Sequence, residues 1–174
     1  MRKVAVVTLL VLVSAVLAVS QQNAPVKKSS VPGKTGVPNK ALMDRIWEGW
    51  STMDPANVAH FYAKGPGHVF FDIAPLKYNS WDEYEAGVKK VLAGFKSIKA
   101  TVNDDAQVHQ AGNLAWGTAT VHHEDVTKDD KTETGDFRWT VVWQKTGPQW
   151  LIVHEHVSAP LAAPEPEKKS EPAQ

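Results

Sequence analysis

The chain has 174 residues, 19 of them basic and 19 acidic, and it contains no cysteine. The absence of cysteine excludes a disulfide framework and a thiolate zinc site, so stability must come from an ordinary apolar core. The balanced charge provides no basic stripe of the kind that nucleic-acid-binding proteins carry. We therefore expect no nucleic acid partner.

The first residues are typical of a secretory signal. Arg2 and Lys3 precede an uncharged run, residues 4–18, that is mostly Val, Leu and Ala and ends in small side chains. We predict a signal peptide over residues 1–18, although a cut after Ser20 is equally compatible. The run is shorter than the roughly 20 apolar residues that span a bilayer, which disfavours an uncleaved anchor. The protein is expected to be secreted or periplasmic and to meet the membrane only during export.

Two proline-rich segments flank the centre of the chain. Residues 19–38 and 161–174 are almost free of large apolar side chains. Such segments cannot bury enough surface to offset the entropy lost on ordering, so we predict a flexible linker and a disordered tail. The remaining residues, 39–160, are of a size typical of a single domain.

Helical periodicity dominates the first half of this domain. Apolar residues three or four positions apart predict a first helix with the stripe Leu42, Ile46, Trp50 and Met53. An Asp-Pro pair at 54–55 favours a short second helix that carries Val58, Phe61 and Tyr62. A capping box at Ser80 and Glu83 predicts a third helix with the stripe Tyr84, Val88, Val91, Leu92 and Phe95.

Beyond Phe95 the period of the apolar residues changes from 3.6 to about 2, which indicates strands. Short polar links separate four of them, at residues 98–109, 114–126, 134–145 and 150–158. A further strand is predicted at 68–73. Helices gathered early and strands gathered late favour an α+β fold with the helices on one face of a curved sheet.

The alternation of apolar and polar residues along the strands predicts which face of this sheet is buried. In the strand 134–145 the apolar set is Phe137, Trp139, Val141 and Trp143, which we assign to the interior. The same reasoning assigns Leu151, Val153, Glu155 and Val157 to the interior, and Trp150, Ile152, His154 and His156 to the outer face. A carboxylate on an apolar face is costly, so Glu155 marks either a cavity or a solvated rim, and burial would raise its pKa.

The pair His154 and His156 has a spacing that can bind a divalent metal. A third ligand would come from His122, His123, Glu124 or Asp72. Both histidines fall on the predicted outer face, where solvent or a partner subunit is the simpler neighbour. We therefore predict no metal site, and no cofactor.

The order of these elements, together with TVVWQKTGPQWLIVHEHVSAP at Thr140 to Pro160, resembles the SnoaL-like branch of the nuclear transport factor 2-like superfamily. The same segment is similar to the end of the association domain of calcium/calmodulin-dependent protein kinase II. The resemblance implies a cone-shaped fold in which a curved mixed or antiparallel sheet wraps on three helices. It also implies a pocket at the wide end of the cone and homodimers packed through the outer sheet face.

The resemblance also points to site residues. Ketosteroid isomerase, a relative with this fold, has its carboxylate base where this chain has Asp72. The positions of its two oxyanion-stabilising donors hold Ile46 and Trp139 here, which disfavours a steroid isomerase mechanism. The arginines in the pocket of the kinase association domain are replaced by Val141 and Val157.

We expect an aromatic, mildly acidic pocket that binds a small apolar or weakly cationic molecule. The predicted lining residues are Trp50, Asp72, Thr118, Thr120, His122, Trp139 and Glu155. The aromatic members of this set could equally be ordinary core residues. One alternative is an isomerase, hydrolase or cyclase with Asp72 or Glu155 as general base and His122 assisting. Another is an assembly module without a ligand, and the sequence leaves open whether the protein is an enzyme.

Overall fold

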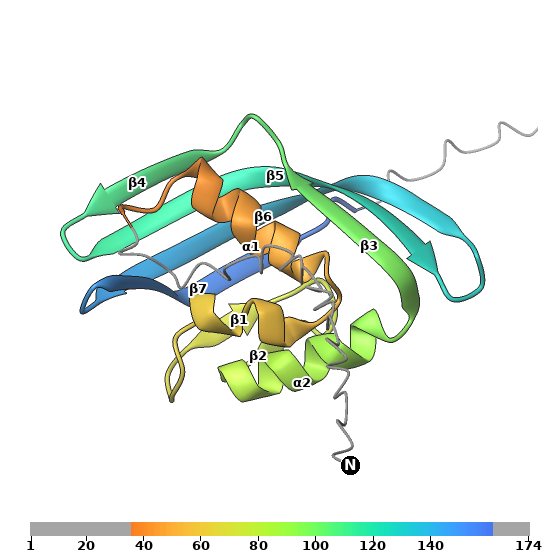
Figure 1. The fold of residues 1–174 in the computed structure, drawn as a ribbon, viewed down its shortest axis with the longest axis horizontal. Helices are drawn as coiled ribbons and strands as arrows, with labels where there is room; N and C mark the ends of the chain where they lie inside the picture. Colours follow the sequence, from red (N-terminus) through yellow and green to blue (C-terminus); the bar gives the residue numbers. More distant parts are fainter. Residues whose placement is uncertain (1–35, 162–174) are drawn as a thin grey trace, which may run out of the picture. The chain divides into compact units, whose positions relative to one another are not determined.

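Capping residues explain where the first helix of the domain begins. A computed structural model describes residues 36–161 (Figure 1), and the predicted signal peptide and nearly all of the predicted linker and tail lie outside the described residues. Helix α1, Lys40–Trp50, begins after Asn39, whose side chain accepts a hydrogen bond of 3.0 Å from the backbone N–H of Leu42. Within residues 36–161, no helix combines the length and hydropathy needed to span a membrane.

The predicted second helix consists of two short 3-10 turns, η1 at Pro55–Asn57 and η2 at Ala59–Phe61. Helix α2, Trp81–Leu92, begins at the predicted capping box, where the Ser80 hydroxyl accepts a hydrogen bond of 3.2 Å from the Glu83 N–H. The buried stripe of α2 is Trp81, Tyr84, Val88 and Leu92, whereas the predicted Val91 is 40% exposed.

Seven strands form one mixed sheet. They are β1 Val69–Phe71, β2 Lys77–Tyr78, β3 Phe95–Val102, β4 Gln107–Ala111, β5 Leu114–Thr127, β6 Thr132–Thr146 and β7 Gln149–Ser158. The order is β2-β1-β7-β6-β5-β3, with β4 also paired to β5. Among these strands of residues 36–161, β1 and β7 pair in parallel and the other pairs are antiparallel. The predicted strand at 98–109 is thus two strands, and β2 was not predicted.

The helices cover one face of the sheet, as the α+β prediction required. Figure 1 shows α1 crossing the face formed by β5 and β6, with α2 lying beyond β1 and β2. Helix α1 also packs against β3, and α2 contacts β1 and β2. On β6 the predicted inner set is confirmed, since Phe137, Trp139, Val141 and Trp143 are at most 8% exposed.

On β7 the predicted alternation is wrong before residue 154, and a β-bulge is the cause. Trp143 pairs with Ile152, while its neighbour Val142 pairs with His154, so Val153 is an extra residue without a partner of its own. An extra residue in one strand reverses the alternation on its other side. The buried residues of β7 are therefore Trp150, Ile152, Glu155 and Val157, and the predicted Leu151 and Val153 are only half-buried.

Candidate functional site

Glu155 is the most deeply buried charged residue in the described part of the chain, with 1% of its surface exposed. The Tyr62 hydroxyl lies 3.1 Å from both carboxylate oxygens, and the Trp139 indole N–H donates to Oε2 at 3.0 Å. The Trp50 indole N–H donates in turn to the Tyr62 hydroxyl at 3.0 Å. Donors from the end of η2 and from β6 thus converge on one carboxylate of β7, and α1 contributes indirectly through the bond from Trp50 to Tyr62.

The surroundings of Glu155 raise its pKa to about 7. Burial is the main cause, because a buried carboxylate loses hydration that its neighbours replace only in part. Hydrogen bonds from Tyr84, Trp139 and Tyr62 lower the pKa, and the negative charge of Asp72 raises it. Burial likewise raises the pKa of both tyrosines well above its usual value, so each keeps its phenolic proton at neutral pH and remains a donor.

A second carboxylate, Asp72, faces the same interior. Strand β1 runs parallel to β7 with Phe70 opposite Glu155, and Asp72 follows two residues later on the same side. Burial raises the pKa of Asp72 to about 6, while the backbone N–H of Ile73, 2.7 Å from Oδ1, lowers it. Unlike Glu155, Asp72 is only half-buried. It therefore marks the place where the acidic interior meets solvent.

Two exposed apolar side chains follow Asp72 in the chain, and a pair of aromatic rings packs next to Glu155. Beyond Asp72, Ile73 and Leu76 are 53% and 81% exposed. The Trp81 ring packs on Tyr62 with a centroid distance of 4.5 Å, and the Lys64 ammonium lies 3.6 Å from the centroid of the Trp81 ring. Tyr62 and Trp81, each 2% exposed, thus form a buried pair of rings next to Glu155, and the Lys64 ammonium lies on the Trp81 ring.

The structure brings four of the predicted site residues together and separates the other three. Trp50, Asp72, Trp139 and Glu155 belong to the buried cluster. Thr118, Thr120 and His122 lie on the opposite face of β5, because the inner set of that strand is Ala115, Gly117, Ala119 and Val121. His122 lies 3.4 Å from Asp136 on this outer face. The predicted assistance of His122 to Asp72 or Glu155 is therefore not supported by its position.

The sequence reasoning missed the role of Tyr62, Tyr84 and Trp81, which it treated only as core residues or left unassigned. A usable signal was present. A carboxylate on the buried face of the sheet needs hydrogen-bond donors. Tyrosine and tryptophan side chains on the apolar stripes of the helices each carry one such donor, an O–H or an N–H group. Ile46, at a position that holds an oxyanion donor in ketosteroid isomerase, is an ordinary core residue with 0% exposure.

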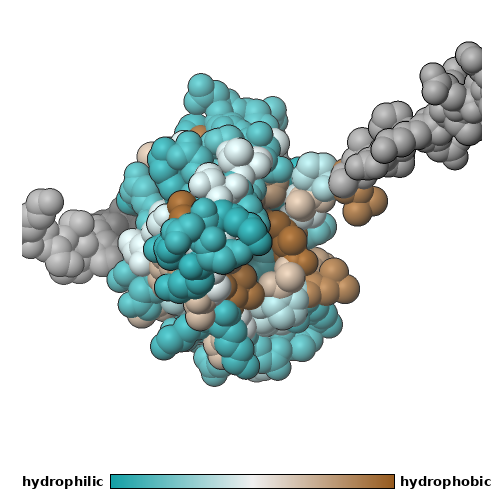
Figure 2. Space-filling view, turned by 90° about the vertical axis from the view of Figure 1, so that its right-hand side faces the viewer, coloured by the Kyte–Doolittle hydropathy of each residue, from teal (hydrophilic) through white to brown (hydrophobic). Residues whose placement is uncertain are grey.

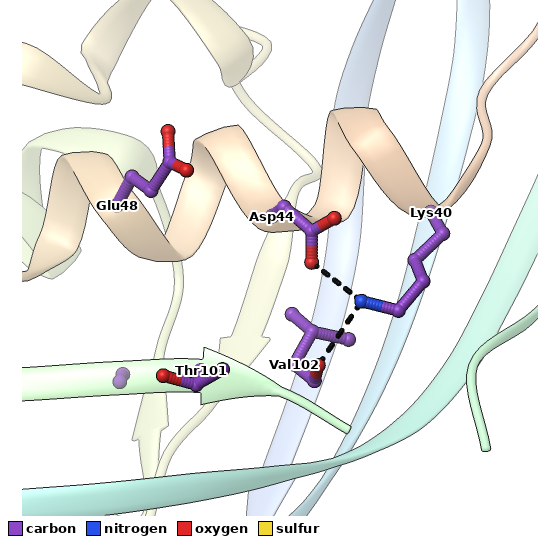
Figure 3. A pocket seen from close by; sticks show the side chains of 6 residues that line it. Lys40, Asp44, Glu48, Thr101 and Val102 are labelled. Carbon is purple, nitrogen blue, oxygen red and sulfur yellow. Dashed lines mark hydrogen bonds and ion pairs between the residues drawn. The ribbon is translucent and has the colours of Figure 1, made fainter. Parts of the chain in front are cut away.

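Two surface hollows lie away from this cluster. One, of ≈ 320 Å³, lies between α1 and β3, and Figure 3 shows Lys40 reaching across it to Asp44 at 2.9 Å and to the Val102 carbonyl at 3.1 Å. The other, of ≈ 570 Å³, lies on the outer face of β3, β5 and β6, next to an ion pair of 3.2 Å between Lys99 and Glu124. Neither hollow is lined by any residue of the Glu155 cluster.

The two histidines of β7 do not converge with other metal ligands. The Nδ1–H of His154 donates to the Val69 carbonyl at 2.6 Å, and His156 is exposed. Over residues 36–161, no three His, Asp or Glu side chains are placed to hold a metal ion.

Comparisons with known proteins agree on one fold. Residues 40–162 match the family model of the SnoaL-like domain. No curated protein sequence matches the chain. A nuclear transport factor 2-like superfamily protein from Salmonella enterica is 21% identical, with a TM-score of 0.64, and the match covers 72% of this chain and 90% of that one.

Two further solved structures have printed functional descriptions. A proposed calcium/calmodulin-dependent protein kinase II association domain from Xanthomonas campestris is 24% identical, with a TM-score of 0.60 and coverage of 75% of this chain and 94% of that one. A proposed dehydratase from Streptomyces avermitilis is 14% identical, with a TM-score of 0.60 and coverage of 71% and 94%. At these identities the likeness shows the fold alone.

Proposed function

This chain belongs to the SnoaL-like domain family, and we propose that it binds a small apolar or weakly cationic molecule where its interior opens at Asp72. The observations that carry this proposal are the half-buried carboxylate of Asp72 on the inner side of the sheet and the Tyr62–Trp81 ring pair, on which the Lys64 ammonium lies. Aromatic walls supply apolar contact area, and a few polar groups set the orientation of a ligand.

The preference for a weak cation follows from charge and from Trp81. Asp72 and Glu155 both contribute negative charge on this side of the sheet, and the charge of Asp72 raises the pKa of Glu155. The indole face of Trp81 already carries the Lys64 ammonium at 3.6 Å. A ligand ammonium or imidazolium group could take the same position, because the face of an aromatic ring attracts cations.

In this proposal the two carboxylates have different tasks. Glu155, with 1% exposure, is enclosed and fixes the orientation of Tyr62 and Trp139. Asp72 is the accessible group and contacts the ligand. A polar group on the ligand would thus meet Asp72 first, with the Tyr62 and Trp81 rings beside it.

An enzyme that moves a proton is the second candidate, and one observation favours it. The raised pKa values, about 6 for Asp72 and about 7 for Glu155, bring both carboxyls close to the range in which a general acid or base works best. The S. avermitilis structure is described as a proposed dehydratase. Loss of water from a substrate next to Asp72 would use such a base.

Export and dimerisation also remain proposals. Secretion is supported by the sequence of residues 1–18. A homodimer through the outer face of the sheet is supported by the likeness to a proposed association domain. Both are compatible with a ligand-binding site, since the outer face and the Asp72 opening lie on different sides of the sheet.

A thermal-shift screen of small amines and neutral apolar compounds tests the binding proposal. Compounds that raise the melting temperature should lose most of that effect in Asp72→Asn, which removes the charge and keeps the shape. Asp104→Asn, a change at an exposed turn residue, is the matched control and should behave as wild type. Compounds that raise the melting temperature of both variants equally would show that they do not bind at Asp72.

A further inference from the structure

A second polar group lies on the inner face near the hairpin that joins β5 to β6, the end of the domain that Figure 2 faces. His123 and Asp125 point inward, and His123 Nδ1 lies 2.7 Å from Asp125 Oδ2. The side chains of Asp125 and His123 are 12% and 26% exposed. The carboxylate is therefore enclosed, and the imidazole provides access from solvent.

Two buried polar atoms near this pair have no hydrogen-bond partner within the described chain. They are Asp125 Oδ1 and the indole Nε1 of Trp47. The Phe137 ring contacts both Trp47 and His123, since its centroid lies 4.9 Å from that of Trp47 and 5.8 Å from that of His123. Leaving such a group unpaired costs about 1–3 kcal/mol. The unpaired Trp47 donor thus lies beside Phe137, and the unpaired Asp125 oxygen belongs to the carboxylate that contacts His123 on the other side of this ring contact.

The imidazole of His123 also has a free nitrogen. Because a carboxylate only accepts hydrogen bonds, Nδ1 carries the proton and neutral His123 presents a lone pair at Nε2. Gly135 lies opposite His123 in the β5–β6 register, and a Cβ atom added there would lie 3.2 Å from Nε2. The glycine leaves room for this edge of the ring, which makes no hydrogen bond to another described residue.

We infer that His123, Asp125 and Trp47 form a second binding site, for a hydroxylated aromatic compound of the phenol class. The ligand hydroxyl donates to His123 Nε2, and its oxygen accepts from the Trp47 indole N–H. The ligand ring packs against Phe137, and a further hydroxyl on a larger member of the class would satisfy Asp125 Oδ1. An unsubstituted aromatic hydrocarbon satisfies none of these atoms and binds more weakly.

This site is distinct from the Asp72 opening. Trp47 also touches Trp139, with a ring distance of 5.4 Å, so the two sites share one aromatic row but no carboxylate. The inference does not depend on the proposed function of Asp72. Either site could be absent without consequence for the other.

Phenol itself is a suitable probe, and the Trp47 indole N–H is a direct reporter. In ¹H–¹⁵N spectra this resonance is identified by its absence from Trp47→Phe, and in wild type we expect phenol to shift it downfield in a saturable manner. Toluene has the same ring without the hydroxyl and should bind about tenfold more weakly or worse, as expected for a lost hydrogen bond.

Variants separate this site from the first one. His123→Gln should weaken phenol binding about tenfold. Asp125→Asn should weaken it as well, because the amide donates to Nδ1 and leaves the proton on Nε2. Asp72→Asn should leave the phenol titration unchanged.

Three results would each overturn the inference. Phenol could leave the Trp47 resonance unmoved up to its solubility limit, or toluene could bind as well as phenol. Phenol could also bind equally to wild type and to His123→Gln. A shift at the Trp139 indole in place of Trp47 would assign phenol to the Glu155 cluster and would count against the second site.

Discussion

At the scale of single residues, the pKa of Glu155 reflects the competition between burial and hydrogen bonding. Tyr62, Tyr84 and Trp139 all donate to the carboxylate and favour its charged form, yet the pKa rises from 4.5 to about 7. Desolvation therefore outweighs three donors. Glu155 therefore binds its proton more tightly in the folded protein than in the unfolded chain. This difference in pKa makes the stability of the fold depend on pH.

This linkage predicts that the free energy of unfolding falls as pH rises. For a carboxyl whose pKa is raised on folding, the stabilisation by the bound proton is complete below the unfolded pKa of 4.5 and is lost as pH rises through about 7. The loss above that range is on the order of 3 kcal/mol. Urea denaturation at a series of pH values should show this fall in wild type, and Glu155→Gln should show a smaller one.

The remaining slope in Glu155→Gln has an expected source. Asp72, whose pKa rises from 3.8 to about 6, shifts stability in the same direction at lower pH. The double variant Asp72→Asn/Glu155→Gln should therefore be nearly independent of pH over the same range. Parallel pH profiles for wild type and Glu155→Gln would show that another group titrates.

A donor removed from Glu155 should cost more than the same change elsewhere in the core. Trp139→Phe keeps an aromatic ring but removes the N–H that donates at 3.0 Å to Oε2. We expect a loss of about 1–3 kcal/mol beyond the smaller ring volume. Trp143→Phe is the control, because Trp143 is equally buried at 1% and does not contact Glu155 through its indole N–H. Equal losses of unfolding free energy for the two variants, measured by urea denaturation, would show that the hydrogen bond from Trp139 to Glu155 adds no stability.

At the scale of elements, local sequence signals predicted where helices begin better than they predicted how a strand continues. The predicted Ser80 capping box and Asp54 cap lie where α2 and η1 begin, because each cap is a contact within four residues. The bulge at Val153 could not be read in the same way. It depends on how β7 pairs with β6, and strict alternation along one strand carries no information about an extra residue.

The bulge predicts unequal losses of stability when two adjacent side chains are truncated. Ile152, 0% exposed, faces the core, while Val153 is only half-buried. Ile152→Ala should lower the free energy of unfolding by about 2–5 kcal/mol. Val153→Ala should cost clearly less, and urea denaturation of the two variants checks this. A larger loss of unfolding free energy for Val153→Ala than for Ile152→Ala would contradict the bulge. It would mean that buried and exposed side chains alternate without interruption from residue 150 to residue 157.

Gly87 predicts a reversal of ordinary helix propensity in α2. Replacing glycine by alanine inside an exposed helix usually stabilises it by about 1 kcal/mol. A Cβ atom at Gly87, however, would lie 2.1 Å from a ring carbon of the buried Tyr78. We therefore expect Gly87→Ala to lower the melting temperature. The double change Gly87→Ala/Tyr78→Leu should recover part of the loss, and recovery of nothing would show that the close approach to Tyr78 is not the cause.

At the scale of the whole molecule, the Glu155 cluster is assembled from segments far apart in the sequence. Glu155 could be singled out because alternation placed a carboxylate among apolar residues, whereas Asp72 was suggested by the resemblance to ketosteroid isomerase. Tyr62 could not be placed beside Glu155, since that contact joins residues 93 positions apart. Thr118, Thr120 and His122 were misplaced because the inner set of β5 is made of small residues, Ala115, Gly117 and Ala119, which do not look like a core face.

The outer face of the sheet predicts the oligomeric state. Thr140 lies on that face near the middle of β6, paired with the exposed His156 of β7, and a stable dimer buries roughly 800 Å² on each partner. We expect wild type to sediment as a homodimer and Thr140→Lys as a monomer, because the change places an ammonium group at the centre of a symmetric interface where it meets its own copy. Asp104→Lys places a lysine at an exposed turn, with an even larger change in net charge, and should remain dimeric. Unchanged circular dichroism would show that Thr140→Lys is folded, and a wild-type monomer, or a dimer in both variants, would exclude this face as the interface.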